Sequence, residues 1–77
     1  IPHGWNTAIG LAADLQLASA FAGAELVEYI IGSPYVDALL ETPWQLDEDG
    51  MLAIPDGPGL GVGIDLDAVR RFADRPL

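Results

Sequence analysis

His3 is the only histidine in the chain, and Glu28 is a carboxylate that interrupts an apolar run. Imidazole titrates near neutral pH, so a histidine can remove a proton from a substrate and return it. A carboxylate in an apolar segment is costly unless it is paired or faces a polar cavity. The two residues are therefore candidates for proton transfer and for substrate contact. The alternatives are a structural or merely exposed histidine and a partly exposed strand end.

Two other patterns could hold an ion or a phosphate, and both are weaker. The acidic run at residues 47–49 lacks the Asp-x-Asp-x-Asp-Gly spacing and distal Glu of a calcium loop. The alternating glycines between Gly57 and Gly63 do not form G-x-G-x-x-G, and no long helix follows them directly. We interpret the first as a solvated turn, with a calcium-binding module as the weaker alternative. The second indicates tight backbone.

The charge balance excludes several classes of partner. The chain has 12 acidic and 3 basic residues, a formal net charge of −9, and its arginines all lie within residues 70–75. A phosphate backbone or an anionic membrane surface would be repelled along most of this length. No apolar run approaches the roughly 18–20 residues of a membrane span. We expect no nucleic acid and no membrane as partner, and the lack of cysteine agrees with a cytoplasmic location.

Two elements must position the candidate residues. Asn6 or Thr7 can cap a helix over residues 8–21, whose leucines point in several directions and therefore need neighbours on more than one side. In this helix we place Asp14 and Gln16 on the solvent edge. Residues 26–31 form a continuous apolar run, as in strands of a parallel sheet that are covered on both faces.

The rest of the chain is rich in turns. Residues 35–40 favour a short helical turn, and Asp49-Gly50 is a strong hairpin signal because both residues tolerate positive φ. Asp65 can cap a last helix over residues 66–73. Trp44 is expected to be a packing anchor, whereas Trp5 could line a pocket beside His3.

Taken together, these motifs resemble the C-terminal end of the mandelate racemase/muconate lactonizing branch of the enolase superfamily. The resemblance covers residues 1 to 72, and the Pro2-His3 opening is most similar to the acid-sugar dehydratases. One departure is Ala22, where relatives usually carry Pro. The motifs that carry the resemblance are P-H-G-W-N-T-A-I-G-L-A-A at residues 2–13, L-V-E-Y at 26–29, D-G at 49–50 and P-D-G-P-G-L-G-V at 55–62.

The resemblance implies an α/β fold, a modified TIM barrel (β/α)7β preceded by an α+β capping domain. Residues 1–32 would be the last βαβ portion of the barrel: the end of strand 7, helix 7 and strand 8. Residues 33–77 would be a C-terminal tail that packs on the barrel and the capping domain. The partner implied is the remainder of the same polypeptide, with barrel strands 1–6, and a homo-oligomer is expected.

The resemblance also implies a chemistry. His3 would act as general base or acid, oriented by an Asp from strand 6, while Glu28 and Trp5 contact the substrate. Mg²⁺ would be held by carboxylates outside this chain, so we expect no metal ligand within it. The enzyme would abstract the proton α to the carboxylate of a sugar acid or other carboxylate substrate.

The reaction implied first is that of an acid-sugar dehydratase, a lyase. A racemase, epimerase or cycloisomerase of the same superfamily is the alternative, and so is an inactive fragment or assembly piece. In either case we expect these 77 residues alone to be inactive, because His3 would lack its partner Asp and the metal.

Overall fold

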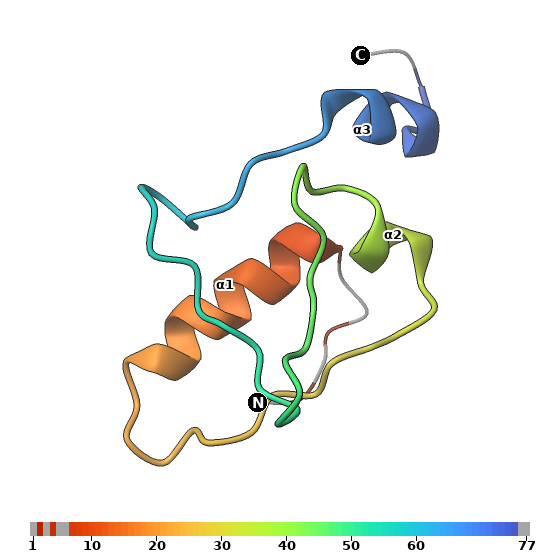
Figure 1. Ribbon diagram of the computed structural model, residues 1–77. Helices are drawn as coiled ribbons and strands as arrows, with labels where there is room; N and C mark the ends of the chain where they lie inside the picture. Colours follow the sequence, from red (N-terminus) through yellow and green to blue (C-terminus); the bar gives the residue numbers. More distant parts are fainter. Residues whose placement is uncertain (1, 3, 5–6, 76–77) are drawn as a thin grey trace.

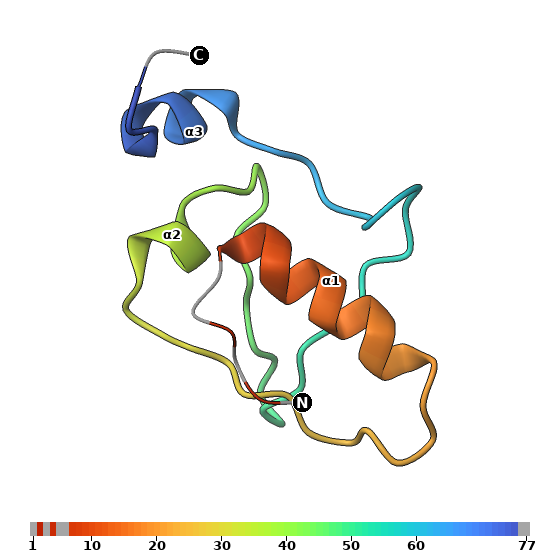
Figure 2. The same ribbon diagram turned by 180° about the vertical axis from the view of Figure 1, so that it is seen from behind.

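The computed structural model describes residues 2, 4 and 7–75, and this part contains the helices α1 (Ala8–Ser19), α2 (Pro34–Asp37) and α3 (Leu66–Phe72). Helix α1 lies in the middle of the molecule, with α3 above it and residues 20–32 looping below (Figures 1 and 2). No helix in the described part has the length and apolar character needed to cross a membrane.

Helix α1 begins where the sequence predicts. Thr7 has an extended backbone, and its hydroxyl oxygen accepts a hydrogen bond from the Ile9 N–H at 3.2 Å. The helix ends at Ser19, two residues before the predicted end at Phe21. Its buried positions follow helical spacing along one stripe: Ala8, Leu11, Ala12, Leu15 and Ala18. Leu17 lies off this stripe and is 53% exposed, so the described residues do not cover that side of α1.

The stripe of α1 packs against two clusters that the tail completes. The first contains Ala8 with Leu39, Leu40 and Ala68, and the second contains Leu11 and Leu15 with Val36. Trp44 packs against both clusters, which confirms its prediction as a packing anchor. Residues far apart in sequence therefore share one small core.

Backbone hydrogen bonds hold the tail together. Leu40 and Ile64 form an antiparallel bridge, flanked by bonds from the Glu41 N–H to the Gly63 carbonyl (3.0 Å) and from the Asp65 N–H to the Leu39 carbonyl (2.9 Å). The Asp65 carboxylate caps α3, as predicted, by accepting from two backbone N–H groups at its start.

The turns follow the sequence closely, and the short helix less so. The predicted Asp-Gly turn forms, with Gly50 at φ 75° and a bond of 2.9 Å from the Asp47 N–H to the Met51 carbonyl. Helix α2 begins at Pro34 and ends at Asp37, so it starts earlier and stops sooner than the predicted turn over residues 35–40. Proline suits a first helical position because its missing N–H would be unpaired there.

The strand predicted over residues 26–31 is not found among the described residues. Among the described residues the one bridge outside a helix is Leu40 to Ile64. Leu26 is 83% exposed and Ile31 is 77% exposed. A parallel strand is covered on both faces. Here the described residues cover one side of the segment, where Val27 and Tyr29 pack against the cluster of Leu11, Leu15 and Val36. The described part of the chain is mostly helix and irregular backbone.

Candidate functional site

Of the three predicted site residues, the structure describes Glu28. His3 and Trp5 lie outside the described residues. Glu28 is exposed and lies in the irregular segment that follows α1. The approach of His3 to Glu28 therefore stays a prediction of the sequence.

A metal site was expected only outside this chain. Among the described residues no three His, Cys, Asp or Glu side chains come together as ligands. In the acidic run, the Asp47 side chain accepts from the backbone N–H groups of Asp49 and Met51, each at 2.9 Å. These bonds close a turn, in agreement with the solvated-turn interpretation.

Tyr29 is a polar group beside Glu28 that the sequence did not single out. It is half-buried and packs against the cluster of Leu11, Leu15 and Val36. Burial raises the pKa of its hydroxyl above the ordinary value of 10.0, and the nearby Asp37 carboxylate raises it further. Tyr29 is thus a neutral hydrogen-bonding group near pH 7. Its only signal in sequence is its position next to Glu28.

Gln16 joins α1 to the tail, so its placement on the solvent edge is wrong. Its side-chain Nε2 donates to the Pro55 carbonyl at 2.7 Å and to the Leu60 carbonyl at 3.3 Å. The two acceptors lie 39 and 44 residues further along the chain. No local pattern could have predicted them. We call these two bonds the Gln16 latch.

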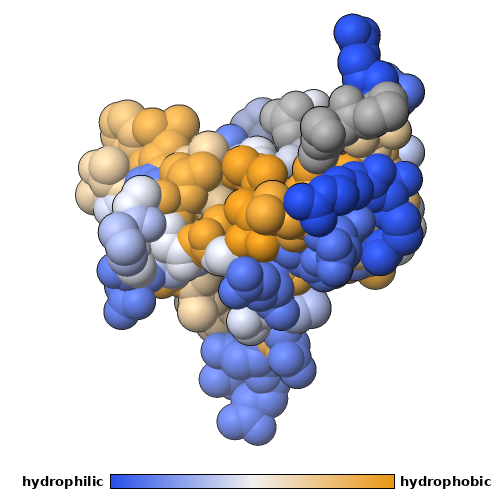
Figure 3. All heavy atoms as spheres, turned by 90° about the horizontal axis from the view of Figure 1, so that it is seen from above, coloured by the Kyte–Doolittle hydropathy of each residue, from blue (hydrophilic) through white to orange (hydrophobic). Residues whose placement is uncertain are grey.

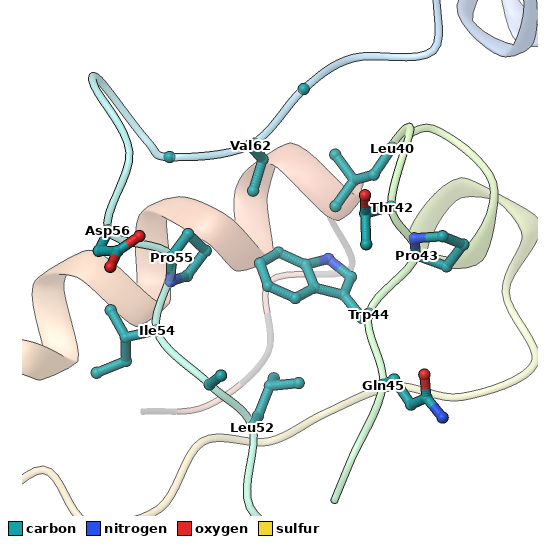
Figure 4. A pocket seen from close by; sticks show the side chains of 13 residues that line it. Leu40, Thr42, Pro43, Trp44, Gln45, Leu52, Ile54, Pro55, Asp56 and Val62 are labelled. Atoms are coloured by element: carbon teal, nitrogen blue, oxygen red, sulfur yellow. The ribbon is translucent and has the colours of Figure 1, made fainter.

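The latch fixes one wall of a cavity of about 520 Å³, which we call the Trp44 groove. Figure 4 shows the indole ring at its centre, with Leu40 and Val62 to one side and Leu52 to the other. The indole Nε1–H of Trp44 is buried and has no acceptor among the described residues. The groove is lined by Leu40, Thr42, Pro43, Trp44, Gln45, Leu52, Ala53, Ile54, Pro55, Asp56, Gly61, Val62 and Gly63.

Comparison with known proteins decides the family. Residues 1–69 match the family described as enolase C-terminal domain-like. The chain belongs to the mandelate racemase/muconate lactonizing enzyme family of the enolase superfamily. The resemblance seen in the sequence is therefore confirmed. This family implies a TIM-barrel-type α/β fold, although the described residues show none of the barrel's sheet.

Three curated relatives of this enolase-superfamily chain are named as cycloisomerases. D-galactarolactone cycloisomerase of Agrobacterium fabrum is 35% identical over 94% of the chain and 21% of its own length. Chloromuconate cycloisomerase of Cupriavidus pinatubonensis is 40% identical over 88% of the chain and 18% of its own length. Muconate cycloisomerase 1 of Rhodococcus opacus is 36% identical over 83% of the chain and 17% of its own length.

The matched region of this enolase-superfamily chain thus spans about a fifth of each relative's length, between 17% and 21%. No solved structure matches the chain. The relatives establish an enzyme family. They do not decide between an isomerase and a lyase reaction for this chain.

Proposed function

We propose that this chain supplies the proton-transfer residue of an enolase-superfamily enzyme, with His3 as the general base or acid at the carbon α to a substrate carboxylate. The observation that carries the proposal is the family match over residues 1–69, which includes His3 and Glu28. A histidine near its ordinary pKa can both accept and return a proton close to neutral pH.

The other two residues would bind and orient the substrate. The Glu28 carboxylate accepts hydrogen bonds from substrate hydroxyl groups, because direct contact with the substrate carboxylate would be repulsive. Trp5 supplies an apolar wall beside His3, which excludes water from the proton transfer. When bound by residues outside this chain, Mg²⁺ would stabilise the negative charge that proton removal leaves on the substrate.

The names of the relatives favour ring chemistry on a carboxylate substrate. All three are called cycloisomerases, and one acts on D-galactarolactone. A cycloisomerase of a sugar-acid lactone or a related carboxylate is therefore our first choice of reaction. Dehydration of a sugar acid is the second, favoured by the Pro2-His3 opening.

The setting of this reaction is also part of the proposal. The remainder of the polypeptide would provide the capping domain and barrel strands 1–6, and the enzyme would work in the cytoplasm as a homo-oligomer. If the 77-residue chain is instead a separate assembly piece, its measured intact mass will be near 8.1 kDa. If it is part of a longer enzyme, the measured intact mass will be several times larger.

Replacement of His3 by Asn in the full polypeptide tests the function. Exchange of the substrate α-proton with D₂O, followed by NMR, should fall about 10²–10⁴-fold, the usual contribution of a general base. Circular dichroism should show an unchanged fold. Exchange at the wild-type rate would remove His3 from the mechanism.

Glu28→Gln tests the contact with the substrate, and Glu25→Gln is its matched control. Glu25 is an exposed carboxylate in the same segment, three residues away. We expect Glu28→Gln to raise KM or lower kcat and Glu25→Gln to change neither. Equal behaviour of the two variants would show that Glu28 has no special role.

A further inference from the structure

Val27 and Tyr29 decide which way the residue between them faces. Both side chains are half-buried and pack against the second of the two core clusters, whereas Glu28 is exposed. When two residues that are two positions apart both face the core, the residue between them is directed to the other side, as in a strand. The two neighbours therefore direct the Glu28 carboxylate away from α1.

A cavity of about 360 Å³ lies beside the same segment and agrees with this orientation. It is lined by side chains of α1, of the segment that follows α1 and of residues 46–54. Val27 and Tyr29 are among the lining residues, and Glu28 is not. Of these two neighbours, Tyr29 has the larger side chain, and an aromatic ring contributes a large contact area to a core. We therefore expect the Tyr29 ring to be the main anchor of the segment.

The ring of Tyr29 is supported by two helices. The cluster that it contacts contains Leu11 and Leu15 from α1 and Val36 from α2. These two helices pack on each other, and Val36 is only 4% exposed. The Asp37 carboxylate at the end of α2 is also close enough to raise the pKa of the Tyr29 hydroxyl. A side chain held by packing in this way is a rigid support for its neighbour.

We propose that Tyr29 is a positioning residue for Glu28: its ring anchors the segment on α1 and α2, so that the Glu28 carboxylate is held on the opposite side, where it contacts the substrate. The inference rests on the proposed function in one respect, the contact of Glu28 with the substrate. A displacement of about 1 Å at such a contact can lower the rate by about 10²-fold. The residue at position 29 should thus affect the reaction without touching the substrate.

Crystal structures of the full polypeptide that contains this chain test the positioning without any substrate. In Tyr29→Ala the Glu28 carboxylate should move by about 1 Å or more from its place in the wild type, whereas Tyr29→Phe keeps the ring and should leave it in place. Tyr29→Val, a milder truncation, gives the same test if Tyr29→Ala does not fold.

Leu52→Ala is the matched control for these structures. Leu52 packs against the same cluster and lines the same cavity, but it belongs to a different segment from Glu28. Its truncation should leave the Glu28 carboxylate in place. An unmoved carboxylate in Tyr29→Ala would overturn the proposal, and so would a shift of equal size in Leu52→Ala.

Steady-state kinetics of the full polypeptide, with a sugar-acid lactone as in the proposed reaction, separate positioning from a merely structural role. Tyr29→Ala should lower kcat/KM by up to about 10²-fold and change the same parameter, KM or kcat, as Glu28→Gln does. In a Glu28→Gln background its further effect should stay within about twofold, because it acts through Glu28. Tyr29→Phe should keep the wild-type values, and Leu52→Ala should have one effect in both backgrounds. Equal losses from Tyr29→Ala in both backgrounds would show that Tyr29 supports only the fold.

This inference and the proposed function fail in different ways. Wild-type kcat/KM in Glu28→Gln would overturn the inference, because Glu28 would then have no contact to be positioned for, and it would leave His3 as the general base. Wild-type exchange of the α-proton in His3→Asn would remove His3 from the mechanism, and the movement of Glu28 in Tyr29→Ala would be unaffected.

Discussion

Two apolar regions of this chain differ in how far their side chains are buried. Helix α1 buries a full stripe of side chains against the tail, with Leu15 only 3% exposed. In the apolar run over residues 26–31, by contrast, Leu26 and Ile31 are 83% and 77% exposed, and Val27 and Tyr29 are half-buried. A helix satisfies its own backbone hydrogen bonds, whereas a strand depends on neighbours. Among the described residues, the apolar stripe of α1 is therefore covered, whereas Leu26 and Ile31 are left exposed.

The surface shows the same division. Figure 3 shows apolar patches on one face of the molecule, bordered by hydrophilic residues. Contiguous exposed apolar surface on a small domain marks an interaction site. The exposed large side chains include Leu17 and Phe21 near the end of α1 as well as Leu26 and Ile31. These exposed apolar side chains are candidates for an interaction surface.

Leu15→Ala and Leu26→Ala give the largest expected contrast. Leu15→Ala should cost about 2–5 kcal/mol of unfolding free energy in the 77-residue chain, because it leaves a cavity in the core. Leu26→Ala should stay within about 0.5 kcal/mol, as at other exposed sites. Urea unfolding measures both. Equal losses of unfolding free energy in the two variants would contradict the difference in burial. A larger loss for Leu26→Ala in the full polypeptide than in the 77-residue chain would indicate that residues 26–31 pair as a strand there.

Gly61→Ala and Gly59→Ala test how tightly the loop over residues 55–61 is packed. Both glycines have positive φ, +80° and +65°, which costs an L-residue about 1–2 kcal/mol. At Gly61 the new Cβ would also clash with Pro55, whereas no described atom lies within 4 Å at Gly59. We expect about 3 kcal/mol for Gly61→Ala and about 1–2 for Gly59→Ala. Equal midpoints of thermal unfolding for the two variants would show that the loop shifts to accommodate the new Cβ at little cost in stability.

Tyr29 links the two regions, and its effect should be the smallest. Its raised pKa means that the folded chain keeps the phenol proton to a higher pH than the unfolded chain does. The resulting stabilisation is complete below the unfolded value near 10 and is lost as pH rises through the folded value. Urea midpoints between pH 7 and 11 should fall more steeply for the wild type than for Tyr29→Phe. Parallel curves would mean that Tyr29 does not contact the core in solution.

The features that were predicted correctly depend on residues close together in the sequence. The caps at Thr7 and Asp65 and the turn at Gly50 each depend on bonds within a few positions, and all three are found. The Gln16 latch was not predicted, because its acceptors lie far along the chain from Gln16. The acceptors are also backbone carbonyls, which every residue carries. The strand predicted over residues 26–31 is not found among the described residues, and strand pairing, like the Gln16 latch, depends on segments that are distant in sequence.

The candidate site was predictable only in part. The residue types of His3 and Glu28 indicated proton transfer and substrate contact, but their roles came from resemblance to a family. The family is now established over residues 1–69, whereas the roles stay predictions. The Trp44 groove could not be predicted, because it needs the fold of the tail around one indole ring.

The Gln16 latch also has a consequence for how the chain is made. Its acceptors are synthesised 39 and 44 residues after Gln16. At the usual 5–20 residues per second, the latch can therefore close only about 2–9 s after Gln16 has been added to the chain. During this interval the newly made helix has only the rest of the nascent chain, or a chaperone, to shield it from water.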